Sequence, residues 1–147
     1  MAAKYAVTQL LDPNTRLSRG VTIPEGKTAI YRDAREGGAI SGPNMTIDFP
    51  EGTIIAKTFT AADEAAGTET PIETRLLIKR VNSKGNVRWV GLPYIWETEN
   101  GKRVAKLALG GGKASISWKT TDVDSGATHT GSTDSYLIPN GNQCLSC

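Results

Sequence analysis

The chain has little of the material from which metal sites and hydrolytic sites are usually built. Its 147 residues include two Cys and a single His, His129. A zinc knuckle generally needs a second Cys pair, which this sequence lacks. His129 stands at no nucleophile–base spacing from a Ser or Thr that rises above chance. An enzyme would need a pocket with convergent ionisable groups, and the sequence does not reveal one.

Long apolar runs are also lacking. No stretch approaches the roughly 18 apolar residues that are needed to span a bilayer, so the sequence predicts no transmembrane segment. The opening residues Met1-Ala2-Ala3-Lys4-Tyr5 are not a signal peptide, because no apolar stretch follows the Lys. These residues alone leave two expectations, a cytoplasmic protein or a chain that lacks its leader.

The charge is balanced and scattered. The 17 Lys and Arg residues against 15 Asp and Glu give a formal net charge of +2, and no run of five or six basic residues occurs. A nucleic-acid surface should show a basic stripe with aromatic residues between the charges. Because the sequence has no such stripe, it predicts no nucleic-acid partner.

What the chain does have is glycine, threonine and short stretches that favour strands. Hydrophobic residues make up only 38 %, and there are 16 Gly, as suits many strands joined by turns. We expect one domain over residues 1–147, with an all-β fold that is an antiparallel β-sandwich or open barrel with long irregular loops. The expected strands are residues 28–31, 53–60, 73–80, 87–92, 104–109, 113–119 and 136–138.

Several turns separate these strands. The region 82–86 predicts a hairpin loop, and Asn100-Gly101 is the strongest short hairpin signal. Pro93 is expected to interrupt the strand that begins at residue 87. The remainder of residues 1–50 is expected to be loosely structured, and residues 61–71 and 122–135 to be polar segments. Residues 62–66 suit one helical turn, and Gly110-Gly111-Gly112 suits a flexible turn, since it lacks the Lys-Ser/Thr of a phosphate loop.

The last four residues, Cys144-Leu145-Ser146-Cys147, contain both cysteines at Cys-x-x-Cys spacing. In the attachment motif Cys-x-x-Cys-His, the two thiols add to the haem vinyl groups and the His binds the iron. The sequence ends before the position of that His. A bare pair is also compatible with a disulfide, free thiols or half of a metal site. Unlike a thioredoxin-like motif, this pair follows strands and opens no predicted helix.

Upstream blocks in the same order resemble a family of bacterial c-type cytochrome proteins of the periplasm or cell surface. The blocks are Phe49–Thr53 with Lys57–Phe59, Ile72–Leu77, Leu92–Trp96, and Ile138–Asn140 with Asn142–Cys144 and Cys147. In that family a β-rich domain leads directly into the Cys-x-x-Cys-His haem motif. The resemblance covers residues 49–147 and implies that residues 139–147 lead into a truncated haem-attachment motif. It further implies that haem c is the cofactor and that Cys144 and Cys147 carry its thioether bonds, with the axial His absent.

Other residues admit a functional interpretation beside a structural one. Trp89, Trp96 and Trp118 suit a stacking platform or, more commonly, a core. Glu73 and Arg75 fall on the same side of one strand, as an anion-binding pair or an exposed charge network. Asp122, Asp124 and Asp134 have the carboxylates of a calcium loop but lack its later bidentate Glu.

We therefore expect an accessory or docking domain of an extracytoplasmic c-type cytochrome that serves electron transfer and is not itself an enzyme. Its partner would be a redox protein or its own downstream cytochrome domain. The alternative is a non-catalytic β-sandwich module for binding or assembly without haem, which would carry at least one Trp in a surface patch.

Overall fold

The computed structural model describes residues 5–12, 15–33, 45–63, 66–122 and 124–145, with the backbone alone for residues 5–12, 15–17, 32–33 and 45–46. The described chain is all-β, as expected, with one short helix near residue 144 that was not predicted. The elements are β1 (Tyr5–Asp12), β2 (Thr15–Thr22), β3 (Ile30–Asp33), β4 (Met45–Asp48), β5 (Ile54–Asp63), β6 (Thr68–Val81), β7 (Val87–Glu99), β8 (Lys102–Leu107), β9 (Gly112–Thr121), β10 (Thr128–Ile138) and α1 (Gly141–Cys144).

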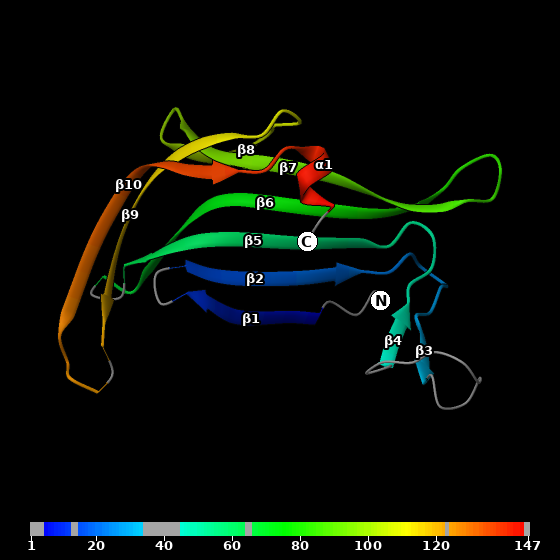
Figure 1. Ribbon diagram of the computed structural model, residues 1–147, viewed down its shortest axis with the longest axis horizontal. Helices are drawn as coiled ribbons and strands as arrows, with labels where there is room; N and C mark the ends of the chain where they lie inside the picture. Colours follow the sequence, from blue (N-terminus) through cyan, green and yellow to red (C-terminus); the bar gives the residue numbers. More distant parts are fainter. Residues whose placement is uncertain (1–4, 13–14, 34–44, 64–65, 123, 146–147) are drawn as a thin grey trace.

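One large sheet dominates the molecule (Figure 1). Six of its strands lie in the order β1-β2-β5-β6-β7-β8, all antiparallel to their neighbours, and β9 and β10 form a further hairpin. A single parallel pair, Asp63 with Lys119, joins β5 to β9. The sheet therefore curls back on itself as an open half-barrel, which is the open-barrel form of the expected fold.

The central strands follow from their composition. The β-branched and aromatic residues of 53–60 and the alternating pattern of 73–80 favour strands, and both form one antiparallel pair of β5 with β6. The hairpin predicted at 82–86 joins β6 to β7. Asn100 and Gly101 have φ values of 50° and 74°, as a type I′ turn requires, and they join β7 to β8.

Pro93 does not interrupt β7, contrary to the prediction. It is paired with Arg75 of β6, and its carbonyl accepts a hydrogen bond from Ala108 N at 2.8 Å. Because the nitrogen and carbonyl of one strand residue point to the same side, the missing N–H faces the side on which β8 ends at Leu107. No ladder bond is lost, so the strand continues to Glu99.

Three expectations about loops are wrong. The first 50 residues contain β1 and β2, which extend the large sheet. The polar segment after residue 60 continues β5 to Asp63 and begins β6 at Thr68, with residues 64–65 of the proposed helical turn outside the described residues. The polar segment after residue 121 is mostly β10, whose many Thr and Ser residues suit an exposed strand. The Gly-rich region 34–44 lies outside the described residues.

A small second sheet, β3 with β4, lies at one end of the large one (Figure 1). Lys79 Nζ forms an ion pair with Asp48 Oδ1 at 2.8 Å. The ring of Phe49 meets Trp89 edge-to-face, with 6.3 Å between the ring centroids. These contacts fix the segment after β4 on β6 and β7.

The sides of the large sheet are set by the alternation of side chains along each strand. We call the side that carries Phe59, Arg75 and Gly91 the inner face; these residues share it because β5, β6 and β7 are in register. The return of β9 and β10 and the helix α1 lie on this inner face. Its buried core includes Phe59, Ala61, Ile72, Ile138 and Cys144, together with the carboxyl side chain of Glu73.

Candidate functional site

The Cys-x-x-Cys pair begins on α1, a helix of a single turn. Asn140 is its N-cap, and its side-chain oxygen accepts a hydrogen bond from Gln143 N at 2.9 Å. The Gln143 side chain in turn accepts from Asn140 N at 3.0 Å, which completes a capping box. Because so short a helix is not stable by itself, the cap and the contacts with the sheet must hold it.

The sheet holds α1 through Gly91 of β7. A Cβ atom at Gly91 would lie 2.8 Å from Gly141 O and 3.0 Å from Cys144 Cβ, closer than real side chains approach. Gly141 N also donates to Leu109 O at 3.0 Å. The absence of a side chain at Gly91 therefore permits the helix to lie directly on the strand, and only 1 % of Cys144 remains exposed.

A hollow of about 700 Å³ adjoins this contact. It opens at the part of β7 that β8 leaves unpaired, since β8 pairs only with residues 94–99. Its lining is more apolar than polar and consists of Arg88, Trp89, Val90, Gly91, Leu92, Leu109, Gly110, Asn140, Gly141, Asn142 and Leu145. The exposed side chains of Leu109 and Leu145 give it an apolar margin.

A buried carboxylate links β10, the strand that precedes α1, to β6. Glu73 has no exposed surface, and Arg75 donates to both of its oxygens, from Nη2 at 2.7 Å and from Nε at 3.0 Å. Tyr136, on β10, donates its hydroxyl to Glu73 Oε1 at 2.8 Å. Glu73 and Arg75 share one side, as predicted, but the exposed charge network expected for them is wrong, because β10 covers the pair.

The Glu73–Arg75–Tyr136 cluster was only partly visible in the sequence. Tyr136 lies 63 positions from Glu73, and no local pattern connects the two. Burial and the adjacent Glu73 carboxylate raise the pKa of the Tyr136 phenol far above its ordinary value. The phenol therefore stays protonated and remains a hydrogen-bond donor to the carboxylate across the physiological range.

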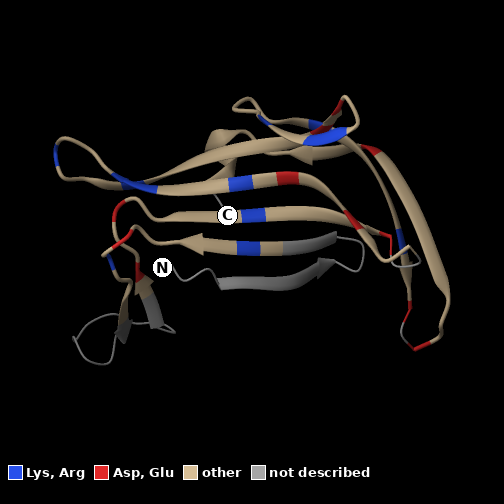
Figure 2. Cartoon of the chain, turned by 180° about the vertical axis from the view of Figure 1, so that it is seen from behind, with Lys and Arg blue, Asp and Glu red and all other residues tan. Residues whose placement is uncertain are grey.

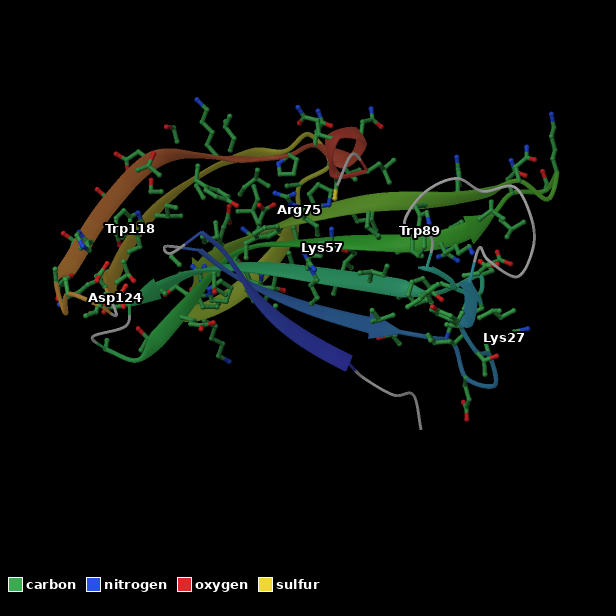
Figure 3. All side chains as sticks on the ribbon, turned by 60° about the horizontal axis from the view of Figure 1, so that its bottom comes forward. Lys27, Lys57, Arg75, Trp89, Trp118 and Asp124 are labelled. Atoms are coloured by element: carbon green, nitrogen blue, oxygen red, sulfur yellow. The ribbon has the colours of Figure 1, made fainter. Side chains whose placement is uncertain are left out.

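The three tryptophans do not form one platform. Trp89 meets Phe49 edge-to-face, Trp96 Nε1 donates to Thr74 Oγ1 at 2.9 Å, and Trp118 lies on the β9–β10 hairpin (Figure 3). All three are half-buried, so each keeps part of its ring at the surface and none belongs to the fully buried core.

Trp118 does line a second hollow, of about 610 Å³, between the ends of β5 and β6 and the β9–β10 hairpin. Asp63 and Lys119 bring opposite charges to this hollow. Its other polar side chains are hydroxyls, from Thr68, Thr70, Ser117, Thr130 and Ser132.

The aspartates near residue 122 close a turn. Asp122 Oδ1 accepts hydrogen bonds from Asp124 N at 3.0 Å and from Ser125 N and Oγ at 2.6 and 2.8 Å. These bonds, with those from Ser125 first, lower the pKa of Asp122. Asp134 lies away from this turn, on β10. Among the residues that the structure describes, no group of three or more His, Cys, Asp or Glu could hold a metal ion.

Of the two predicted haem-attachment residues, the structure places Cys144, whereas Cys147 lies outside the described residues. His129 lies on β10, exposed and paired with Thr120 of β9, and it is not brought to α1. Within the described chain, no helix is long and apolar enough to cross a membrane. Comparison with protein-family models, with curated proteins and with solved structures yields no match to this chain.

Proposed function

We propose that this chain is an accessory or docking domain of an extracytoplasmic c-type cytochrome, in which Cys144 and Cys147 carry the haem. The observation that supports this most directly is the seating of α1 on Gly91. A Cys-x-x-Cys pair in an unattached tail would need no such glycine. Here the first cysteine of the pair is fixed against a strand, so that whatever it carries is held at a defined place on the sheet.

The surroundings of the helix suit a flat and mostly apolar group. The hollow beside α1 offers Leu92, Leu109 and Leu145 as apolar walls, and burial of such surfaces is favourable in proportion to the area removed from water. Haem, when bound, supplies one-electron chemistry. The residues of this chain contribute attachment through the two thiols, an apolar wall, and a sheet that fixes the orientation of the group.

The enclosed position of Cys144 sets a condition on attachment. A thioether bond requires the thiol to reach the vinyl group, but the docked helix leaves only 1 % of this residue exposed. We therefore place attachment before α1 docks on β7, with docking as the step that fixes the product. The axial His that the resemblance implies would follow Cys147.

Haem c attachment takes place outside the cytoplasm, so the proposal places the protein in the periplasm or at the cell surface. Its partner would be a separate redox protein or its own downstream cytochrome domain. The unpaired edge of β7 and the apolar margin around Leu109 offer that partner a contact surface next to the attachment site.

The test is a chain extended by a His after Cys147 and expressed outside the cytoplasm of a host with the c-haem maturation system. We expect a mass increase of one haem that survives denaturation, together with a sharp Soret band. The same chain with Cys144→Ser and Cys147→Ser is the matched control and should stay colourless. If the extended chain itself is folded and colourless, the proposal is wrong.

The hollow around Trp118 favours a second candidate function, a non-catalytic binding module for a small polar ligand. An indole with five hydroxyl side chains and one pair of opposite charges suits a neutral molecule that makes many hydrogen bonds. Saccharide titrations followed by tryptophan fluorescence would test it. A saturable change that is lost in Trp118→Phe would support this function, and the absence of any change would refute it.

A further inference from the structure

β7 is paired on only one side along its first half. Residues 87–95 pair with β6, whereas β8 pairs only with residues 94–99. The carbonyl of Asn86 faces β6, because it accepts a hydrogen bond from across the hairpin at 3.0 Å, and the carbonyl of Pro93 faces the opposite side, where it accepts from Ala108 N. Backbone groups of successive strand residues alternate between the two sides. The odd-numbered residues before Pro93 therefore direct their N–H and C=O groups to the side that β8 leaves open.

Val87 and Trp89 are the residues at which this edge is free. Among the residues that the structure describes, their N–H and C=O groups form no hydrogen bond on that side. Gly91 follows in the same orientation, but α1 lies directly on it, so the helix marks the end of the free stretch. We call residues 87–90 the open edge. Its two N–H donors and two C=O acceptors are the groups with which an extended peptide adds a strand to a sheet.

The space for an added strand lies directly beside the open edge. The hollow of about 700 Å³ is lined by residues 88–92 in succession, so it follows the backbone of β7 and not one face of the sheet. Val87 is 57 % exposed at one end of this stretch, and Leu109 and Leu145 are exposed beside the hollow at the other. An extended chain that lies here would remove apolar surface from water as well as pair with the backbone.

The same end of the β6–β7 hairpin is strongly basic. Between Glu73 and Glu97 the chain has five basic residues and no acidic one. Arg75 and Lys79 are ion-paired with acids. The other three are exposed, and none forms an ion pair within the part of the chain that the structure describes: Arg80, Lys84 and Arg88. Figure 2 shows blue without red at this end of the hairpin.

The pairing of the strands concentrates this charge. Arg80 and Arg88 lie directly opposite each other on β6 and β7, where like charges destabilise a sheet. Glu51, whose Oε1 accepts a hydrogen bond from Val81 N at 3.1 Å, brings one negative charge against the three positive ones. An excess of positive charge remains next to the open edge. A segment with acidic residues is therefore attracted to it, and a segment with basic residues is repelled.

We propose that the open edge binds an acidic, extended segment of a partner protein as an added antiparallel strand. Val87 and Trp89 would exchange backbone hydrogen bonds with it. Arg88 and Val90 would face it in the non-hydrogen-bonded positions, where opposing side chains lie closest. The segment that fits has an apolar residue opposite Val90 and, two positions later, an acid opposite Arg88. This deepens the partner contact of the proposed function, because it names the chemistry of the partner at that edge, and it needs no haem.

The first experiment measures the fluorescence anisotropy of a labelled peptide with the core Val-Leu-Glu-Val-Glu, titrated with the full chain. In the proposed register the first Val lies opposite Val90, Leu opposite Trp89, and the first Glu opposite Arg88. We expect saturable binding. N-methylation of Leu and the second Val should weaken it at least about fivefold, because those two amides face β7. N-methylation of the two Glu residues is the matched control and should leave binding unchanged, because their amides face away.

A change in the protein tests the same hydrogen bonds from the other side. Val87→Pro removes the N–H that faces the open side and keeps the ladder with β6, as Pro93 already does further along β7. It should weaken peptide binding at least about fivefold, with unchanged β-sheet circular dichroism. Val87→Thr keeps the N–H and is the matched control, which should bind as the wild type does.

A charge exchange tests the acidic character of the segment. Arg88→Glu should weaken the acidic peptide about threefold or more and should bind more tightly a peptide with Lys in place of both Glu residues. Lys102→Glu is the matched control, because Lys102 is exposed at the other end of β7, and it should change neither affinity.

The proposal is overturned if the acidic peptide does not bind, if both N-methylated peptides bind equally, if Val87→Pro binds as well as Val87→Thr, or if the Lys peptide binds the wild-type chain as tightly as the acidic one. All of these measurements use the chain without haem. Their failure is therefore a separate result from a colourless extended chain, which bears on haem attachment alone.

Discussion

At the scale of single residues, Gly91 determines where the Cys-x-x-Cys pair is held. It lies within β7, where a glycine has no side chain to pack and weakens the strand. A glycine is needed at this position because Gly141 and Cys144 approach the strand closely and occupy the space that a side chain would need. The sequence could show a glycine between Val90 and Leu92, but not that a helix 50 positions later would lie on it.

Gly91→Ala should destabilise the protein and release α1. The added methyl group would overlap Gly141 O and Cys144, which costs about 1–3 kcal/mol of unfolding free energy. In a Cys147→Ser background, the rate of Cys144 modification by a thiol reagent should rise as the helix separates from the sheet. Gly20→Ala is the control, because no atom lies within 4 Å of its added Cβ; equal effects of the two variants would contradict the account.

Tyr136→Phe should cost about 1–3 kcal/mol of unfolding free energy, because a fully buried carboxylate loses one of its donors. Urea unfolding measures this directly. Tyr31→Phe serves as the control, since Tyr31 is exposed and a change there should stay within about 0.5 kcal/mol. A Tyr136→Phe chain as stable as the wild type would show that the bond contributes nothing.

The same phenol gives the protein a dependence on alkaline pH. Burial and the Glu73 carboxylate raise the pKa of Tyr136 above its ordinary value of 10.0. The folded state therefore keeps a proton that the unfolded state loses, so this contribution is complete below pH about 10 and falls as the pH rises further. Stability measured from pH 8 to 11 should fall more steeply for the wild type than for Tyr136→Phe, and parallel curves would contradict this.

At the scale of elements, local sequence patterns predicted where strands occur better than they predicted the residues at which the strands begin and end. Strand composition identified β5, β6 and β7, and Asn100-Gly101 identified the turn after β7. The patterns failed for β10, since exposed Thr, Ser and Asp residues have the composition of a loop. They failed for Pro93 because the effect of a proline depends on where the neighbouring strand ends, which is a property of the pairing.

The cap of α1 is an element-scale feature that can be tested. Asn140→Ala removes the side-chain acceptor for Gln143 N and half of the capping box, which should cost about 1 kcal/mol. Asn142→Ala is the control, because Asn142 lies two residues after Asn140 and is exposed. Urea unfolding should separate the two variants, and a larger effect of Asn142→Ala would show that the cap is not what holds the helix.

The β9–β10 hairpin depends on a second close approach. A Cβ at Gly131 would lie 2.1 Å from Trp118 Cζ2, because the indole lies across the glycine on the neighbouring strand. Gly131→Ala should displace the ring, destabilise the hairpin by about 1–3 kcal/mol and change the tryptophan emission. Ser132→Ala, at the next and exposed position, should do neither; unchanged emission in Gly131→Ala would contradict this packing.

At the scale of the whole molecule, the curl of the sheet brings together residues that the sequence separates widely. The pair Glu73 and Arg75 could be placed on one side from alternation alone, but its burial depends on β10 folding over the inner face. The contact of Cys144 with Gly91 likewise depends on the register of β7 with β6. Because one residue of slip would place a strand's side chains on the opposite face, these sites could not be predicted from composition or spacing.

The position of α1 after all ten strands has a consequence for biosynthesis. Its docking surface, β7, is made some 50 residues before Cys144, so the strand can be complete before the cysteine is added. Because the docked helix leaves only 1 % of Cys144 exposed, the thiol is most accessible between its synthesis and its arrival on Gly91. The rate at which α1 docks on β7 therefore limits the time available for modification of the cysteine. A mutation that speeds docking should shorten this time, and one that slows docking should lengthen it.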